Sequence, residues 1–183
     1  GRLISEGPAC RMVVLNPQPR PESSISAKSE SLNNLSVVTE LVCREQRVLF
    51  TGDIERETLT RLTDSGTSAH IALLKVPHHG AKSSLERRWL ETIRPAVGVV
   101  SAGRRNPYGH PAGEVLAAYQ AVETQVWRTD RDGAIWADLD LTRQELSMHS
   151  TREWILQPAL PSADIWSVEQ DNLRRLWRRW NWT

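Results

Sequence analysis

The sequence predicts a layered α/β domain whose sheet is partly antiparallel. Between 71 and 121, short apolar runs alternate with amphipathic segments of helical period, which is typical of β-α units and parallel strands. Around this region, at 35–51 and 124–139, strand patterns follow one another without a helix between them, which predicts hairpins. The predicted order is therefore β, ββα, βα, βα, ββ, which describes a half-domain rather than a complete doubly wound fold.

Each predicted element rests on a local signal. β-branched runs indicate strands, i/i+3/i+4 apolar spacing indicates helices, and Pro or Gly ends most of them. The predicted elements are strand 11–15, hairpin 35–42 with 48–51, helix 54–62, strand 71–76, a helix capped by Ser83 or Ser84 and ended by Pro95, strand 97–101, a helix from Pro111 to about 121, hairpin 124–129 with 134–139 around a turn at 130–133, and an edge strand at 143–148.

The bulk properties fit one domain, residues 1–149, followed by a tail at 150–183. The chain has 183 residues and a net charge of +1, so composition alone implies neither a nucleic-acid binder nor an acidic partner. Clusters of Pro and Ser at 16–33 predict an exposed, mobile loop. The tail interleaves Trp with Arg, and we expect it to pack on the domain, to bind single-stranded DNA or to lie on an anionic membrane.

Cys10 and Cys43 are the only cysteines, and neither lies in a CxxC motif, which argues against a thiolate zinc site, while one disulfide is possible. No apolar run approaches the roughly 20 residues of a membrane-spanning helix. The chain starts at Gly1 without an initiator Met, from which we expect a fragment or a processed chain.

Polar side chains follow the ends of three predicted strands. His78 and His79 come after strand 71–76, Asp53 follows Gly52 after strand 48–51, and His110 lies between Gly109 and Pro111 after strand 97–101. Ligands in open α/β sheets bind at the carboxyl ends of strands, and imidazole is the commonest metal ligand among side chains. The sequence therefore predicts that three strand ends converge on one metal site.

Each of these residues also has a structural interpretation. Asp53 is well placed to cap the next helix, and His110 could cap a helix at a turn. The adjacent side chains of His78 and His79 diverge, so one would face the metal while the other orients a ligand, contacts substrate or transfers a proton. Lys75 and Lys82 could contact phosphate, although exposed lysines are usually only solvated.

Several motifs then occur in an order that resembles a known family. They are Asn34-x-Ser36, Leu49 to Asp53, Leu74 to Ser84, Ser101 to Pro111, and Arg128-Thr129-Asp130 leading to Gly133. Each motif alone is weakly specific, but their shared order over about 12–139 resembles the C-terminal metallo-β-lactamase-like domain of ComEC-type competence proteins. The resemblance implies a four-layer αββα fold of which this chain is the C-terminal half.

The resemblance further implies a metal-dependent nuclease or phosphodiesterase that processes incoming DNA during natural transformation. Asp53 matches the bridging carboxylate, His110 matches the last metal ligand, and His78 and His79 match paired histidines typical of the family. From this we expect Asp53, His78 and His110 to bind two Zn or Mn ions, and His78 and His79 to act in catalysis. The implied parent is a DNA-channel protein of the bacterial inner membrane, with this domain outside the bilayer.

One departure from the family is large. The early histidine-rich cluster of the form HxHxDH does not occur in this sequence. We therefore expect the missing N-terminal half and the membrane channel to be partners from the same polypeptide, and this fragment alone to be inactive. The alternatives are a soluble hydrolase of another substrate with the same fold, and a non-catalytic module of a DNA channel.

Overall fold

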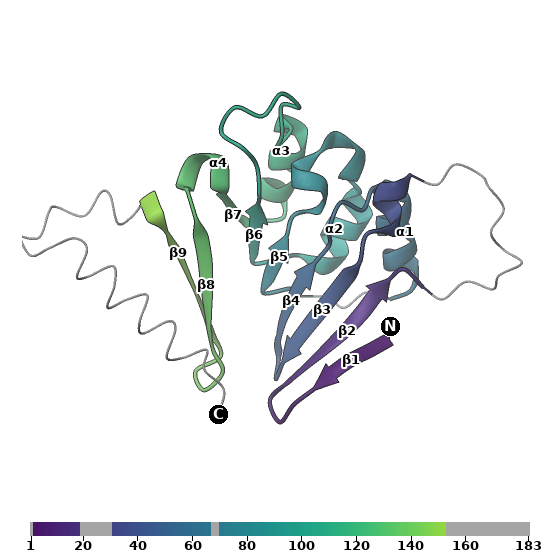
Figure 1. Cartoon of the computed structure of the whole chain (residues 1–183), viewed down its shortest axis with the longest axis vertical. Helices are drawn as coiled ribbons and strands as arrows, with labels where there is room; N and C mark the ends of the chain where they lie inside the picture. Colours follow the sequence, from purple (N-terminus) through teal and green to yellow (C-terminus); the bar gives the residue numbers. More distant parts are fainter. Residues whose placement is uncertain (1, 19–30, 67–69, 153–183) are drawn as a thin grey trace, which may run out of the picture. The chain divides into compact units, whose positions relative to one another are not determined.

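The computed structural model describes residues 2–18, 31–66 and 70–152 of the chain (Figure 1). Within these residues lie a seven-stranded sheet and a separate two-stranded sheet. The strands are β1 (Arg2–Glu6), β2 (Cys10–Asn16), β3 (Val38–Cys43), β4 (Gln46–Phe50), β5 (Leu73–Lys75), β6 (Val97–Val100), β7 (Gln125–Arg128), β8 (Ile135–Asp140) and β9 (Glu145–Ser150). The helices are α1 (Arg56–Asp64), α2 (Arg87–Ile93), α3 (Gly113–Ala121) and α4 (Thr129–Asp132), with 3-10 turns η2 (Leu32–Leu35), η3 (Pro77–Gly80) and η4 (Lys82–Ser84).

The order of the strands in the large sheet follows the chain from β1 to β7. Strands β1 to β4 pair antiparallel, and short connections join β1 to β2 and β3 to β4 as hairpins. Strands β4 to β7 pair parallel, and each connection between them contains a helix. The sheet is therefore mixed, as the sequence predicted, and the described chain has an α/β fold.

The three crossover helices α1, α2 and α3 lie on the same face of the sheet (Figure 1). Parallel crossovers are right-handed, and successive strands are added in one direction here, so every helix is placed on the same side. The core forms between the two layers, where Leu49 and Leu74 from the strands meet Leu59 and Trp89 from the helices, each at most 1% exposed. The carboxyl ends of β4, β5 and β6 consequently lie together at one end of the sheet.

Two predictions for the C-terminal part of the domain were wrong. The strand at 134–139 does not return as a hairpin arm beside 124–129: β8 pairs antiparallel with β9 in the two-stranded sheet. The predicted turn at 130–133 is the short helix α4, because the Asp132 carboxylate accepts from the Arg128 backbone N–H at 2.9 Å and closes a helical turn. The edge strand predicted at 143–148 is present as β9, which pairs with β8 in the two-stranded sheet.

Helix and strand starts also differ from the sequence predictions. Helix α2 is capped by Glu86, whose side chain accepts from the Arg88 N–H at 3.0 Å, whereas Ser83 and Ser84 lie in the preceding 3-10 turn. Helix α3 begins at Gly113, so Pro111 lies outside it. Strand β3 begins at Val38 because η2 occupies the start of the predicted strand, and β1 was not predicted at all.

A disulfide joins Cys10 of β2 to Cys43 of β3, which lie directly opposite each other in the antiparallel register. The disulfide that the sequence allowed is therefore present. Residues 19–30 of the predicted loop and most of the predicted tail lie outside the described residues. None of the described helices is long and apolar enough to cross a membrane.

Candidate functional site

The polar side chains predicted from three strand ends lie together in the structure. The imidazole rings of His78 and His110 are 6.0 Å apart between centroids, and Nε2 of His79 lies 3.5 Å from Oδ1 of Asp53. A backbone hydrogen bond from the His78 N–H to the Gly52 carbonyl, 3.1 Å long, ties the ends of β4 and β5 together. This arrangement follows from parallel pairing of β4, β5 and β6, which brings their carboxyl ends to one edge.

His78 and His79 both adopt the left-handed backbone conformation, with φ of 45° and 56°. Residues other than Gly rarely adopt this conformation, and such strain is concentrated at functional sites. The two rings diverge, with centroids 6.3 Å apart, so each contacts different residues.

The tautomer of His79 is determined by its neighbour. Nδ1 of His79 lies 2.6 Å from the carbonyl oxygen of Ser101, which can only accept a hydrogen bond, so Nδ1 carries the proton. In the neutral ring, Nε2 then presents a lone pair on the side where the Asp53 carboxylate lies. A histidine that binds a metal through one nitrogen usually donates from the other in this way.

His78 faces a different carboxylate, Glu55, which the sequence did not single out. Nδ1 of His78 lies 3.4 Å from Oε1 of Glu55, and the same oxygen accepts from Ser83 at 3.1 Å and from Asn33 at 3.2 Å. Burial raises the pKa of Glu55, but the hydrogen bonds and the nearby His78 outweigh it and hold that pKa below its usual value. The only sequence signal for Glu55 is its position two residues after Asp53.

His110 lies at the edge of this group with an unusual environment. Its Nδ1 is buried and has no hydrogen-bond partner among the described residues. Burial lowers the pKa of His110, and positive charge on His78 and His79 lowers it further. The outer side of the ring stacks on Tyr108, with centroids 5.9 Å apart and an interplanar angle of 21°.

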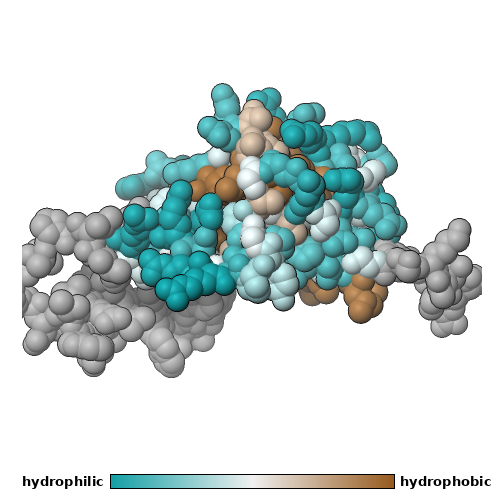
Figure 2. Space-filling model, turned by 90° about the horizontal axis from the view of Figure 1, so that it is seen from above, coloured by the Kyte–Doolittle hydropathy of each residue, from teal (hydrophilic) through white to brown (hydrophobic). Residues whose placement is uncertain are grey.

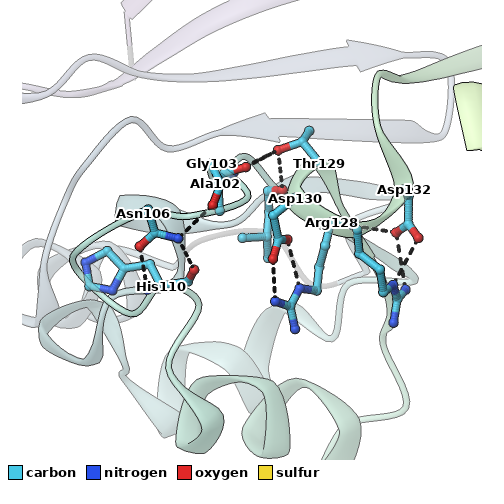
Figure 3. A network of polar contacts seen from close by, with 10 residues as sticks. Ala102, Gly103, Asn106, His110, Arg128, Thr129, Asp130 and Asp132 are labelled. Carbon is cyan, nitrogen blue, oxygen red and sulfur yellow. Dashed lines mark hydrogen bonds and ion pairs between the residues drawn. The ribbon is translucent and has the colours of Figure 1, made fainter.

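The loop before His110 is held by a side-chain amide (Figure 3). Oδ1 of Asn106 accepts from the His110 N–H at 2.9 Å, while its Nδ2 donates to the carbonyls of Gly103 and His110 at 2.9 and 2.8 Å. At the base of the loop, Thr129 accepts from the Ala102 N–H and donates to the Ala102 carbonyl, at 2.8 and 2.9 Å. These bonds give a structural role to residues that the sequence identified only as motif members.

The backbone around Asp53 is supported by η2. Oγ of Ser36 accepts from the Asp53 N–H at 3.1 Å, and Oδ1 of Asn34 accepts from the Glu55 N–H at 2.8 Å. Gly52 has φ of +56°, and a Cβ atom there would fall 2.7 Å from Cβ of Ser36. The Asn34-x-Ser36 and Gly-Asp motifs are therefore two sides of one contact.

The two lysines considered as phosphate contacts are already engaged. Nζ of Lys75 donates to the Val76 carbonyl at 2.9 Å, and burial lowers its pKa although the Asp53 carboxylate acts in the opposite direction. Lys82 forms an exposed ion pair with Glu114 at 3.2 Å.

A metal requires several converging donors, and the described residues supply part of such a set. Asp53 and His79 face each other, and His110 presents a buried nitrogen that lacks a partner. Among the residues that the structure describes, no three His, Cys, Asp or Glu side chains form a group that could hold a metal ion. The expected set of Asp53, His78 and His110 is therefore not assembled as a complete site by this part of the chain.

Comparison with known proteins shows sequence similarity between this chain and three longer bacterial proteins. No family model matches the chain. The chain is 33% identical over 105 residues to ComE operon protein 3 of Bacillus subtilis, and 30% identical over 105 residues to Recombination protein 2 of Haemophilus influenzae. Each match covers 57% of this chain. The chain is also 28% identical over 133 residues, 72% of its own length, to the uncharacterized protein YcaI of Escherichia coli.

The matched region corresponds to only a small part of each relative. It covers 14%, 13% and 17% of the three proteins, so the matched segment spans about one seventh of their length. The similarities to the first two proteins fit a competence-related protein, in agreement with the family that the motifs resemble.

Proposed function

We propose that this chain is the C-terminal part of a metallo-β-lactamase-like domain that hydrolyses phosphodiester bonds in DNA, within a protein for DNA uptake. The observation that supports this most strongly is the approach of Asp53 Oδ1 to His79 Nε2 at 3.5 Å. The carbonyl of Ser101 fixes the tautomer that leaves Nε2 of His79 free to bind a cation beside the carboxylate.

In this proposal Asp53 and His79 hold a divalent ion such as Zn or Mn, and His110 is a further donor. Carboxylate and imidazole are ligands suited to these ions. When bound, the metal would supply a more acidic water and neutralise charge on the phosphoryl oxygens. The remaining ligands would come from other parts of the parent protein, since the relatives are several times longer than this chain.

His78 is suited to proton transfer in the same proposal. Its Nδ1 faces Glu55 and Ser83, at 3.4 and 3.5 Å, which leaves its Nε2 free to hold a proton for the departing oxygen. Burial raises the pKa of Glu55, but its hydrogen bonds hold that pKa below the usual value, so the carboxylate beside Nδ1 of His78 stays ionised.

The test uses the full-length parent protein, which in this proposal contains a DNA channel in the bacterial inner membrane. Asp53→Asn keeps the size of the side chain and one acceptor oxygen, but it removes the charge and replaces the other oxygen with an NH2 donor. We expect it to lose bound metal, measured by mass spectrometry, together with hydrolysis of single-stranded DNA. The matched control is Asp64→Asn on α1, which removes an exposed carboxylate paired with Arg88 and is expected to keep both.

A non-catalytic module of a DNA channel is the second candidate. The observation that favours it is that His78 and His79 each lie beside a carboxylate of this chain, Glu55 and Asp53, which accounts for both rings as ion pairs. This candidate predicts that Asp53→Asn leaves DNA processing and uptake intact. Loss of metal and hydrolysis in that variant excludes it.

A further inference from the structure

We propose that the loop between β6 and α3 binds single-stranded nucleic acid, with a base stacked on Tyr108 and phosphates bound by Arg104 and Arg105. We call residues 103–110 the Tyr108 loop. The inference rests on the proposed function for the phosphodiester substrate, and it identifies where the strand would be held beside the site.

Tyr108 is unusually exposed for an aromatic residue, at 78% of its surface. One side of its ring stacks on His110, so this face is anchored against the candidate site. Packing does not explain a ring that is mostly in solvent. An exposed aromatic face beside a phosphodiester site is suited to stacking a base, which contributes roughly 1–3 kcal/mol per base in proteins that bind single strands.

Two cations lie in the same loop. Arg104 and Arg105 are both exposed, and neither side chain forms an ion pair or hydrogen bond within the described part of the chain. Guanidinium groups bind phosphate oxygens with two parallel hydrogen bonds. The combination of an aromatic ring with free cations is the pattern by which proteins bind single-stranded nucleic acid without sequence preference.

The loop is also preorganised. Asn106 bonds to both ends of the segment between Gly103 and His110, and Thr129 holds Ala102 at its base (Figure 3). The loop rises above the carboxyl ends of the parallel strands (Figure 1). A ring on a rigid support loses little conformational freedom on binding, which favours affinity.

The surroundings favour nucleic acid over a membrane or an apolar peptide. Seen from above, most of the surface at this end is hydrophilic, drawn in teal, with a smaller brown hydrophobic area (Figure 2). Within the Tyr108 loop, Tyr108 is the only large hydrophobic residue that is exposed. Because duplex bases are already stacked on one another, a single exposed ring fits an unpaired base.

The experiment measures binding of fluorescent 12-nucleotide strands by anisotropy with the 183-residue chain, without added metal. We compare oligothymidine DNA, the matching RNA, and a DNA strand that lacks bases. Tyr108→Ala should weaken binding of the strands with bases by roughly 5- to 150-fold and leave the abasic strand unchanged. Tyr108→Phe keeps the ring and should bind as the wild type does.

Salt dependence tests the cations separately. Arg104→Gln with Arg105→Gln should weaken all strands, and it should reduce the slope of log K against log salt by about 1.4, or about 0.7 for each phosphate contact. The matched control is Arg87→Gln at the start of α2 with Arg94→Gln just after its end, two exposed arginines outside this loop, which should keep the wild-type slope. The C-terminal arginines are the same in every variant, so their contribution cancels.

Three results would overturn the inference. They are unchanged binding in Tyr108→Ala, an equal loss in Tyr108→Phe, and wild-type binding of the abasic strand as tight as that of the normal strand. Equal binding of DNA and RNA supports stacking on a base, and a preference for one identifies the nucleic acid. Because no hydrolysis is measured, these results are independent of whether Asp53 is needed for catalysis.

Discussion

Gly80 and Pro111 are in direct contact, so closely that a Cβ atom on Gly80 would fall 2.6 Å from Cβ of Pro111 and 3.1 Å from its Cα. The Ala112 N–H also donates to the Gly80 carbonyl at 2.9 Å. Through this contact the turn that carries His78 and His79 is fixed against the loop that carries His110. The glycine is therefore required by space as well as by its backbone conformation.

Gly80→Ala should lower the free energy of unfolding by roughly 2–5 kcal/mol. A left-handed backbone, with φ of +78°, adds about 1–2 kcal/mol for any residue with a Cβ, and overlap with Pro111 adds about 1–3 kcal/mol. Urea unfolding measures the change. The matched control is Gly66→Ala, where φ is +80° and nothing lies within 4 Å of the added atom, so only the backbone penalty applies. Equal losses in the two variants would contradict a steric role for Pro111.

Asp130 should contribute stability that is lost in acid. The guanidinium of Arg128 bonds both carboxylate oxygens, at 3.0 and 2.7 Å, and this holds the pKa of Asp130 below its usual value of 3.8 although burial opposes it. With the folded pKa below the unfolded one, the unfolded chain binds more protons in acid, so this stability is present above about pH 4 and disappears as pH falls through the folded pKa.

The variant Asp130→Asn tests this directly by urea unfolding between pH 7 and pH 3. We expect it to be less stable than the wild type by roughly 1–2 kcal/mol at pH 7, with the difference shrinking below about pH 4. Asp64→Asn is the control, because the pair between Asp64 and Arg88 is exposed and should contribute about 0.5 kcal/mol or less. A constant difference across this pH range would contradict the sign derived from the pKa.

The sequence predicted those strands whose hydrophobic pattern matches their place in the sheet. The run before His78 is apolar because β5 lies in the middle of the sheet, and Gly52-Asp53 ends β4 as expected. The hairpin predicted at 124–139 does not form, although both of its segments are strands. The short helix α4, which Asp132 closes, lies between them, and β8 pairs with β9 instead. Periodicity reports that a strand exists, but it does not report its partner.

The candidate site divides in the same way. Asp53, His78, His79 and His110 were predictable because each follows a strand end, and strand ends meet at one edge of a parallel sheet. The sequence does not predict the contact of His78 with Glu55 or that of His79 with Asp53. Both contacts depend on how the side chains point after the turn. The sequence suggested that the rings diverge, but it could not indicate which carboxylate each would meet.

The disulfide between Cys10 and Cys43 should contribute substantially to stability. It closes a loop with a sequence separation of 33, which corresponds to roughly 2–4 kcal/mol through the reduced entropy of the unfolded chain. Urea unfolding with and without a thiol reductant should show this difference in the wild type. Cys10→Ala with Cys43→Ala should match the reduced protein and show no response to the reductant. A wild type that is equally stable in both conditions would contradict the prediction.

Asn16 supports the segment beside the candidate site, and its removal should lower the free energy of unfolding. Its buried amide donates to the carbonyls of Asn34 and Ser36, at 2.9 and 2.8 Å, and so holds the η2 segment that contacts Asp53 and Glu55. Asn16→Ala removes this donor from the part-buried Ser36 carbonyl and leaves the Asn34 carbonyl with only the longer bond from Thr58 at 3.4 Å, and an unsatisfied buried group costs about 1–3 kcal/mol.

We expect Asn16→Ala to lower the free energy of unfolding by roughly 2–4 kcal/mol in urea. The matched control is Gln18→Ala, which also removes an amide that donates to a backbone carbonyl, that of Leu15, but in an exposed position. Water replaces the lost bond there, so the change should stay within about 0.5 kcal/mol. Similar losses in the two variants would mean that burial of the Asn16 amide does not stabilise η2, and the support proposed for the Asp53 backbone would then have to come from Ser36 alone.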